Sequence, residues 1–278
     1  MTLSDFASRL GDTLKGIIKI ATGSRIIRNT PQASGRIIIL GNGPSLRTTI
    51  AENSELLKSE DTMAVNFMAN TPEFVLLQPR YYILADPHFF TGLEHENVKA
   101  LWKNISDATW PMTLFVPARR LKQARELTSA ANAGLTLATF NFVGIEGFDF
   151  FERVVFSAGL AMPRPRNVLI PAIMCAIRMG FTKIDIVGAD HSWLETIRVT
   201  DENHVVSVQP HFYADSSKEL KRSETEYRGY HLHDILRSFY IAFSSYHRLQ
   251  RYAFSRGITV TNATPGSYID AFPRIPLK

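Results

Sequence analysis

Short runs of apolar residues alternate along the chain with segments in which apolar residues recur every three or four positions. The runs have the length and composition of buried strands, and the periodic segments have the pattern of amphipathic helices. We predict strands at 37–40, 62–66, 81–85, 113–116, 135–140, 183–187 and 258–261, and helices at 45–57, 98–104, 119–131, 148–157, 168–179 and 234–255. Strands interleaved with helices are typical of parallel βαβ units. The pattern therefore predicts a Rossmann-like α/β domain, with a mostly parallel sheet and helices on both of its faces.

The first predicted strand runs into a turn rich in glycine. Its four branched residues cannot alternate between two environments, which indicates a strand covered on both faces. They are followed by Gly41, Asn42, Gly43, Pro44 and Ser45. Glycine lets the backbone approach a ligand closely, proline suits the first turn of a helix, and the serine hydroxyl lies at a helix amino end, where an anion is favoured. Two interpretations stay open, a ligand-binding loop and an ordinary strand-to-helix turn, because the sequence is neither G-x-G-x-x-G nor a P-loop.

A second glycine turn follows the predicted strand at 183–187. There a helix closed by Gly180 leads into the strand, and Gly188, Ala189 and Asp190 come directly after it. Ligands of open α/β sheets bind at the carboxyl ends of the strands, so we expect the two glycine turns to meet at one edge. From about residue 192 to 230 the chain becomes polar and loses its periodicity. A loop of that length inside a domain predicts a lid.

The first 34 residues differ in pattern from the rest. Apolar residues recur at helical spacing, at Phe6, Leu10, Leu14, Ile17 and Ile18, and basic residues lie off this stripe, at Arg9, Lys15 and Lys19. We predict an amphipathic helix and a polar linker over 1–34, before a main domain over 35–278. The segment lacks the cleavage site of a secretory signal, so we expect it to be retained. Three partners for the helix stay open: the domain itself, a second subunit in a homo-oligomer, or a membrane surface.

Composition narrows the class of protein. The 278 residues, 45% of them hydrophobic and 21% charged, suit a soluble protein, and no apolar run is long enough to span a bilayer. The net charge of +5 favours an anionic partner such as a nucleotide or a phospholipid surface, but it is small for a nucleic-acid-binding protein, and we expect no nucleic-acid partner. A single cysteine, Cys175 in an apolar run, excludes an intrachain disulfide and a cysteine zinc site. We expect a cytoplasmic protein, held peripherally at the inner membrane face.

Several motifs occur in the order found in a known family. They are GNGPSL at 41–46, VNF at 65–67, ADPHFF at 85–90, GFDFF at 147–151 and MGFTKIDIVGAD at 179–190. In this order, from residue 36 to the carboxyl end, the chain resembles the bacterial lipooligosaccharide sialyltransferases. The first motif alone is shared with a wider group that includes motility-associated glycosyltransferases and hydroxymethylpterin pyrophosphokinase-like proteins.

The resemblance implies a variant glycosyltransferase-A fold with a lid and a metal-independent reaction. The enzyme would move sialic acid or a related acidic sugar from a CMP-linked donor to a cell-surface glycan or glycolipid, with no further cofactor. The sequence agrees on one point. It contains no Asp-x-Asp pair, the carboxylate pair that holds a divalent ion under a sugar diphosphate, and this fits a monophosphate donor.

The resemblance also assigns the donor site. It implies that Asn42 and Asn66 contact the donor phosphate and the base or sugar, and that Asp190 contacts the nucleoside. Structural alternatives are a left-handed turn residue for Asn42, a strand-end cap for Asn66 and a helix cap for Asp190. The family's two phosphate-binding tyrosines are replaced here by Ser192 and, approximately, Arg198, which supply a hydroxyl and a positive charge. The predicted donor-binding residues are Gly41, Asn42, Gly43, Pro44, Ser45, Asn66, Asp86, Asn167, Gly188, Asp190, His191, Ser192 and Arg198.

A histidine at the end of the lid is the implied general base, since a neutral imidazole suits proton abstraction near pH 7. Two candidates, His231 and His233, flank Leu232. We favour His231, because Asp234 would cap the following helix and leave His233 in the cap turn. Two other functions stay open: a pterin pyrophosphokinase-like enzyme that uses ATP and magnesium, and a nucleotide-binding module without catalysis.

Overall fold

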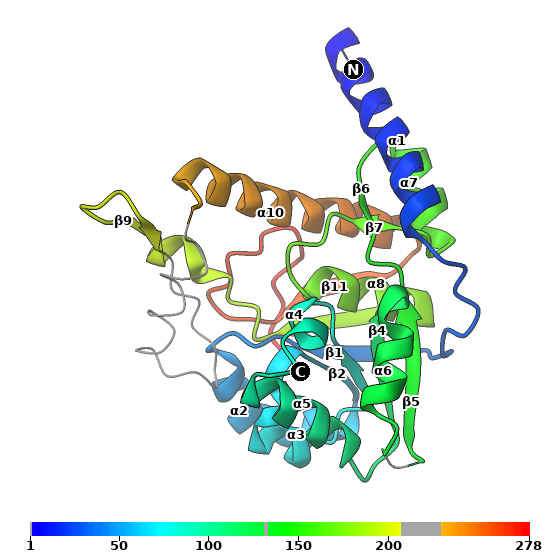
Figure 1. Cartoon of the computed structure of the whole chain (residues 1–278), viewed down its shortest axis with the longest axis vertical. Helices are drawn as coiled ribbons and strands as arrows, with labels where there is room; N and C mark the ends of the chain where they lie inside the picture. Colours follow the sequence, from blue (N-terminus) through cyan, green and yellow to red (C-terminus); the bar gives the residue numbers. More distant parts are fainter. Residues whose placement is uncertain (1, 131–132, 207–228) are drawn as a thin grey trace.

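A parallel sheet of seven strands, in the order β11-β8-β1-β2-β3-β4-β5, lies at the centre of the computed structural model (Figure 1). The structure describes residues 2–130, 133–206 and 229–278. The strands are β1 (Arg36–Leu40), β2 (Asp61–Val65), β3 (Tyr81–Ile83), β4 (Met112–Pro117), β5 (Leu135–Phe140), β8 (Lys183–Val187) and β11 (Thr259–Asn262). Every neighbouring pair in this sheet is parallel. The seven predicted strands are thus confirmed, each end to within two residues.

Helices cover both faces of the sheet, as expected for a Rossmann-like fold. They are α1 (Leu3–Gly23), α2 (Leu46–Ser59), α3 (Pro72–Leu77), α4 (His88–Thr91), α5 (Glu96–Ser106), α6 (Leu121–Leu127), α7 (Asp149–Ser157), α8 (Leu169–Met179) and α10 (Leu232–Ser255). Short 3-10 turns are η1 (Asn66–Asn70), η2 (Ala118–Arg120) and η3 (Ser192–Thr196), and the pairs β6 (Gly144–Ile145) with β7 (Met162–Pro163) and β9 (Arg198–Val199) with β10 (Val205–Val206) form two small sheets. The helix predicted at 119–131 is shorter than expected, because α6 already ends at Leu127.

The branched run of β1 is buried on both faces of the sheet. Ile37 and Ile39 pack into a core formed with α7, α8 and α10. Ile38 and Leu40 pack into a second core, with α2, α3 and α5. All four side chains are fully buried, which is the reason for an uninterrupted apolar run in place of an alternating one.

The order of the strands creates a topological switch point between β1 and β8. From β1 the chain builds the sheet outward through β2, β3, β4 and β5, and it then returns to place β8 and β11 on the other side of β1. The connections after β1 and after β8 therefore leave in different directions. In open α/β sheets a crevice forms at such a point, outside the carboxyl ends of the strands.

The predicted amino-terminal helix is present as α1, beside β6 and α7 (Figure 1). The segment after α1, residues 24–34, is hydrogen-bonded to the main domain at both of its ends. The Ser24 hydroxyl donates to the Leu160 carbonyl at 2.5 Å, and the Ala33 N–H donates to the Met179 carbonyl at 2.9 Å. The boundary at residue 34 stays a prediction. Among the described residues, no helix has both the length and the apolarity needed to cross a membrane.

Candidate functional site

The two glycine turns lie against each other at the switch point. The Gly41 N–H donates to the Val187 carbonyl at 2.8 Å, and the Gly43 N–H donates to the Gly188 carbonyl at 2.7 Å. A Cβ at Gly41 would lie 2.5 Å from the Gly188 oxygen, and Gly188 itself has a φ of +63°. The glycines are needed here for the contact between the two turns. The predicted meeting of these turns at one edge is confirmed.

The side chain of Asp190, which follows β8, lies at the amino end of α2. Its carboxylate accepts a hydrogen bond of 2.8 Å from the Ser45 hydroxyl and one of 3.3 Å from the Ser45 N–H. Burial raises the pKa of the Asp190 carboxyl above its ordinary value, and the hydrogen bonds from Ser45 oppose that shift. We expected the anionic group of a ligand at this helix end. The carboxylate of Asp190 takes that position instead. The helix-cap alternative for Asp190 describes these contacts.

The carboxyl-terminal segment holds the second turn in place. The Thr264 hydroxyl accepts from the Ala189 N–H at 3.0 Å, and the Ser267 hydroxyl donates to the Ala189 carbonyl at 2.6 Å. The Tyr268 N–H donates to the Asp190 carbonyl at 2.9 Å. No motif marks these residues in the sequence, although they follow the predicted strand at 258–261 and so had to lie at the same edge of the sheet.

Asn42 and Asn66 continue the edge on the other side of β1. Asn42 is buried, and its Nδ2 donates to the Val65 carbonyl at 3.1 Å, which ties the first turn to β2. The left-handed alternative for Asn42 is wrong, because the left-handed residue is Asn66, with a φ of +51°. The Oδ1 of Asn66 is buried and has no hydrogen-bond partner among the described residues. A buried acceptor without a protein partner is a group that a ligand or water donor would satisfy.

Asp86 follows the end of β3, two strands away from β1. It is exposed, and its Oδ1 accepts from the His88 N–H at 2.8 Å. This contact turns the chain into α4. Asp190, Asn42, Asn66 and Asp86 therefore follow the carboxyl ends of four successive strands, β8, β1, β2 and β3. Within the described residues, no three His, Cys, Asp or Glu side chains are grouped so as to hold a metal ion.

His191 lies in the interior directly behind Asp190. Its backbone is left-handed, with a φ of +54°, and its Nε2 lies 2.7 Å from the Tyr246 hydroxyl. That hydroxyl also donates to the Asn167 Oδ1 at 3.0 Å, and the His191 ring stacks on Trp193 with centroids 4.2 Å apart. Burial lowers the pKa of His191 to about 3, so the ring is neutral at pH 7. The contacts link the Asp190 turn to α8 and α10.

The buried imidazole predicts an acid-sensitive fold. In the unfolded chain His191 titrates near 6.5, and in the folded chain near 3, so between these values only the unfolded state binds the proton. Stability therefore falls as the pH falls through 6.5, and this residue removes about 1.6 kcal/mol between pH 6.5 and pH 5. Urea unfolding at both pH values measures the change. A His191→Asn variant tolerates the left-handed backbone and should lose this share of the pH dependence. An unchanged pH dependence in that variant would mean that His191 is not buried and neutral.

The remaining donor-binding candidates are spread out. Ser192 is half-buried and begins η3, directly after His191. Arg198 is exposed on β9, which with β10 stands away from the sheet (Figure 1). Pro44 and Asn167 precede α2 and α8, and the Asn167 Oδ1 accepts from the Leu169 N–H at 3.0 Å. The structure thus gathers the residues of the two turns and leaves Arg198 apart from them.

The two candidate bases occupy the start of α10, and both are exposed. His231 is the N-cap residue, and its N–H donates to the Asp234 Oδ2 at 3.1 Å. The His233 Nε2 lies 3.4 Å from the Asp234 Oδ1. Asp234 does cap the helix, as expected, and leaves His233 in the first turn. It acts from the third position of a capping box, and His231 is the N-cap residue. Most of the predicted lid, 207–228, lies outside the described residues.

Comparisons with known proteins show the fold alone. No known protein family matches the chain, and no curated protein matches its sequence. Among solved structures, it is similar to the "MAf glycosyltransferase from Magnetospirillum magneticum AMB-1", with a TM-score of 0.50 and 10% sequence identity. The similarity covers 95% of this chain and 38% of that one. The chain therefore spans well under half the length of this structural neighbour, with which it shares a Rossmann-like arrangement.

Proposed function

We propose that this chain is a glycosyltransferase that binds a nucleotide-activated sugar at the switch point between β1 and β8. The observation that carries the proposal is the contact between the two glycine turns, 41–45 and 188–190, at the carboxyl edge of a parallel sheet. This is where open α/β sheets bind their ligands. A structural neighbour that is named a glycosyltransferase supports the same class of enzyme.

We further propose a CMP-linked acidic sugar as donor, on the resemblance of the motifs to the lipooligosaccharide sialyltransferases with their variant glycosyltransferase-A fold. The acceptor is then a cell-surface glycan or glycolipid. The unmatched Asn66 Oδ1 supports a ligand that donates a hydrogen bond at this edge. The amino group of a cytosine ring and the hydroxyl of a sugar are both such donors. Asn42 lies next to Asn66 through its bond to the Val65 carbonyl, so the two amides would contact neighbouring parts of one ligand.

In the proposed reaction an acceptor hydroxyl attacks the anomeric carbon of the donor sugar. A new bond forms between that oxygen and the carbon, the bond from the carbon to the phosphate oxygen breaks, and CMP leaves with the electron pair. His231 takes the hydroxyl proton. Ser192, half-buried directly after the Asp190 turn, offers its hydroxyl as a hydrogen-bond donor to the leaving phosphate. No metal ion is required, since a monophosphate carries less charge than the diphosphate that divalent ions serve.

The proposal is tested by titrating the chain with CMP, UDP, GDP and ATP in a calorimeter, in buffer containing EDTA. We expect CMP to bind, and we expect sugar transfer from a CMP donor to persist in the chelator. Asn66→Ala should weaken CMP binding about tenfold, the cost of one lost hydrogen bond to a ligand. Asn203 is the matched control, because it is also left-handed, with a φ of +61°, but lies exposed on the hairpin of β9 and β10. Asn203→Ala should leave CMP binding unchanged.

The same titration separates the other function classes. Tight ATP binding without a response to CMP would assign the chain to the pyrophosphokinase-like enzymes. Transfer that EDTA abolishes and magnesium restores would contradict the metal-independent reaction. CMP binding with no transfer to any glycan acceptor would favour a nucleotide-binding module.

A further inference from the structure

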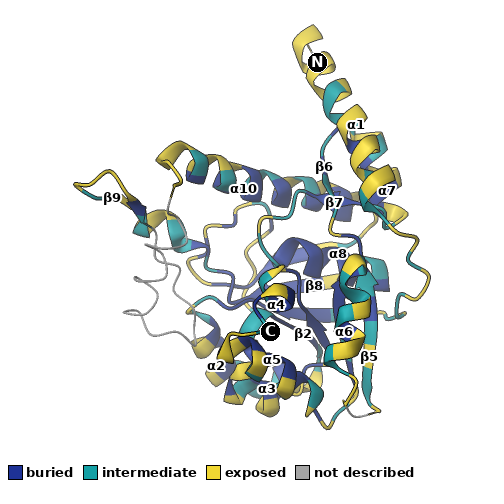
Figure 2. Ribbon diagram, viewed as in Figure 1, coloured by how far each residue is buried: buried dark blue, intermediate teal, exposed yellow. Residues whose placement is uncertain are grey.

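One side of α1 presents apolar residues that the described part of the chain leaves uncovered. Leu14 is 54% exposed, Ile17 49% and Ile18 64%, and Leu3 near the start of the helix is 87% exposed. Figure 2 shows α1 as exposed along most of its length, where it stands out from the body. Large apolar side chains gathered on one helix face in this way mark an interaction surface. We refer to Leu3, Leu10, Leu14, Ile17 and Ile18 as the α1 stripe.

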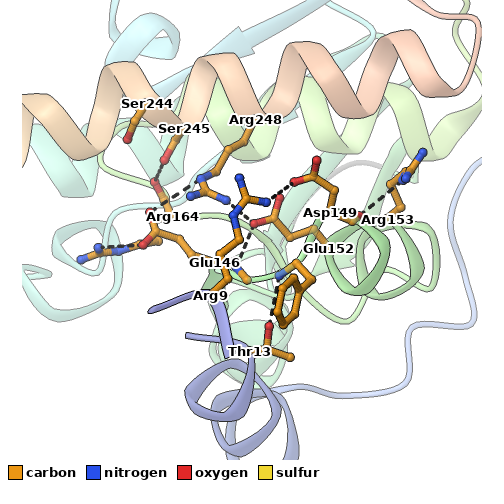
Figure 3. A network of polar contacts seen from close by, with 12 residues as sticks. Arg9, Thr13, Glu146, Asp149, Glu152, Arg153, Arg164, Ser244, Ser245 and Arg248 are labelled. Atoms are coloured by element: carbon orange, nitrogen blue, oxygen red, sulfur yellow. Dashed lines mark hydrogen bonds and ion pairs between the residues drawn. The ribbon is translucent and has the colours of Figure 1, made fainter. Parts of the chain in front are cut away.

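The orientation of the stripe is fixed by contacts that the adjoining side of α1 makes with the body (Figure 3). Arg9 forms an ion pair of 3.2 Å with Asp149, at the start of α7. The Thr13 hydroxyl accepts from the Phe148 N–H at 3.1 Å. Gly16 is buried, and a Cβ at this position would lie 3.0 Å from the Phe151 ring. Because a helix presents one residue about every 100°, these anchors leave the α1 stripe in the neighbouring sector, away from the body.

The anchors belong to a lobe that is itself tied to the core. Glu152 of α7 is 5% exposed and forms an ion pair with Arg248 of α10 (Figure 3). Its carboxylate also accepts from the Gly147 N–H at 2.9 Å. Burial raises the pKa of Glu152, and Arg248 opposes the shift. The platform under α1 is therefore held by buried polar contacts, and α1 keeps one face free.

Positive charge is concentrated in the same segment. Residues 1–34 contain five basic and two acidic residues, a net charge of +3 within a chain whose net charge is +5. Both acidic side chains are engaged within the helix, Asp5 in the cap with Thr2 and Asp12 at 3.8 Å from Lys15. Arg25 and Arg28 are exposed in the segment that follows. The uncovered apolar face is thus accompanied by cations, a combination that suits an anionic lipid surface.

The neighbouring helix extends this surface. On α7, Phe150 is 75% and Val154 51% exposed, one helical turn apart, and Arg153 between them is exposed too. The ion pair from Arg9 and the contact between Phe6 and Phe148, with ring centroids 5.3 Å apart, place α7 beside the first half of α1. Two helices therefore offer apolar side chains and cations at the same end of the molecule (Figure 1).

We propose that α1 docks in the plane of an anionic membrane surface, with the α1 stripe in the boundary between headgroups and acyl chains and with Lys15 among the headgroups. The charge favours this occupant over a second copy of the chain. A two-fold interface brings the same patch of both subunits together, and two segments of net charge +3 would then face each other. An anionic bilayer is attracted by the same charge. The proposal does not depend on the identity of the donor.

Vesicle co-sedimentation of the full chain tests the proposal. We expect binding to vesicles of phosphatidylcholine and phosphatidylglycerol in a ratio of about 3:1, with little binding to phosphatidylcholine alone, and weaker binding at high salt. A Leu14→Gln/Ile18→Gln variant should bind at least about tenfold more weakly. A Lys15→Gln variant should lose part of its affinity for the mixed vesicles and none for phosphatidylcholine alone. These side chains are exposed, so the melting temperature should not change.

The matched control is a pair of exposed apolar residues elsewhere on the surface. Val75 and Leu76 on α3 are 63% and 49% exposed, close to the values for Ile18 and Ile17, and α3 lies at the other end of the molecule from α1 (Figure 1). Val75→Gln/Leu76→Gln should bind vesicles like the wild type. Equal losses in both double variants, or no vesicle binding by the wild type, would overturn the proposal. So would light scattering that shows a dimer in the wild type and a monomer in Leu14→Gln/Ile18→Gln, since the stripe would then be a subunit interface.

Discussion

Replacing Gly43 with alanine is expected to lower the free energy of unfolding by about 3 kcal/mol and sugar transfer by about 100-fold. A Cβ at this position would collide with the Asp190 carboxylate and lie 2.7 Å from the Gly188 oxygen. The turn cannot retreat, because the Gly43 N–H is bonded to that same Gly188 oxygen. Either Asp190 leaves Ser45 or the two turns separate. Urea unfolding measures the first effect, and initial transfer rates measure the second.

Gly11 provides the control for this substitution. It lies inside α1, and a Cβ there would have nothing within 4 Å. Gly11→Ala should therefore raise the free energy of unfolding by about 0.5–1 kcal/mol through helix propensity, with transfer unchanged. Wild-type stability and activity in Gly43→Ala would show that the two turns are not in the contact described.

The strands could be predicted from the sequence because a parallel sheet buries both faces of its central strands. The run at 37–40 is uniformly apolar for that reason, and the run at 183–187 is closed by glycine on both sides. The strand order could not be predicted, since several orders satisfy the same pattern and only the folded chain sets β8 beside β1. The short helices α3 and α4 were missed, because fewer than two turns show no period.

The two glycine turns were predicted to meet at one edge, and they do, but their side chains make other contacts than expected. Ser45 was expected to face a ligand anion, and it binds Asp190, which is 145 residues away in sequence. No local pattern announces a contact of that range. Likewise, the motifs contain two asparagines with no local sign of how they differ. In the structure Asn66 has the left-handed backbone, and the Asn42 side chain is hydrogen-bonded to the Val65 carbonyl of β2. The motifs therefore predicted the edge of the sheet at which these residues lie, and the order of the strands determines which residues they contact.

The start of α10 is tied to the candidate site through apolar contacts. Ile235 and Phe239, one and two turns into the helix, form a small core with Val205. Trp193 packs on this core, with its ring 5.5 Å from that of Phe239, and stacks on His191 beside Asp190. The first turn of α10 is therefore packed beside the hairpin of β9 and β10, and Trp193 connects this region to His191.

His231→Ala is expected to lower turnover by about two to four orders of magnitude while the affinity for CMP changes little. His233→Ala should cost much less. The structure adds a complication, since His231 is also the N-cap residue of α10, and losing a cap destabilises a helix on its own. His231→Asn separates the two roles, because asparagine is a good N-cap residue but not a base at neutral pH.

If His231 is the base, the alanine and asparagine variants should lose turnover equally, and a His233→Asn control should stay close to the wild type. Recovery of turnover in His231→Asn would assign the residue to capping alone. Loss in the His233 variants with full activity in the His231 variants would exchange the two assignments. Full activity in all four would remove acid–base catalysis from this turn and, with CMP still bound, favour a nucleotide-binding module. Transfer rates at saturating donor, together with calorimetric CMP affinities for each variant, decide between these outcomes, because a base acts on turnover and a binding residue acts on affinity.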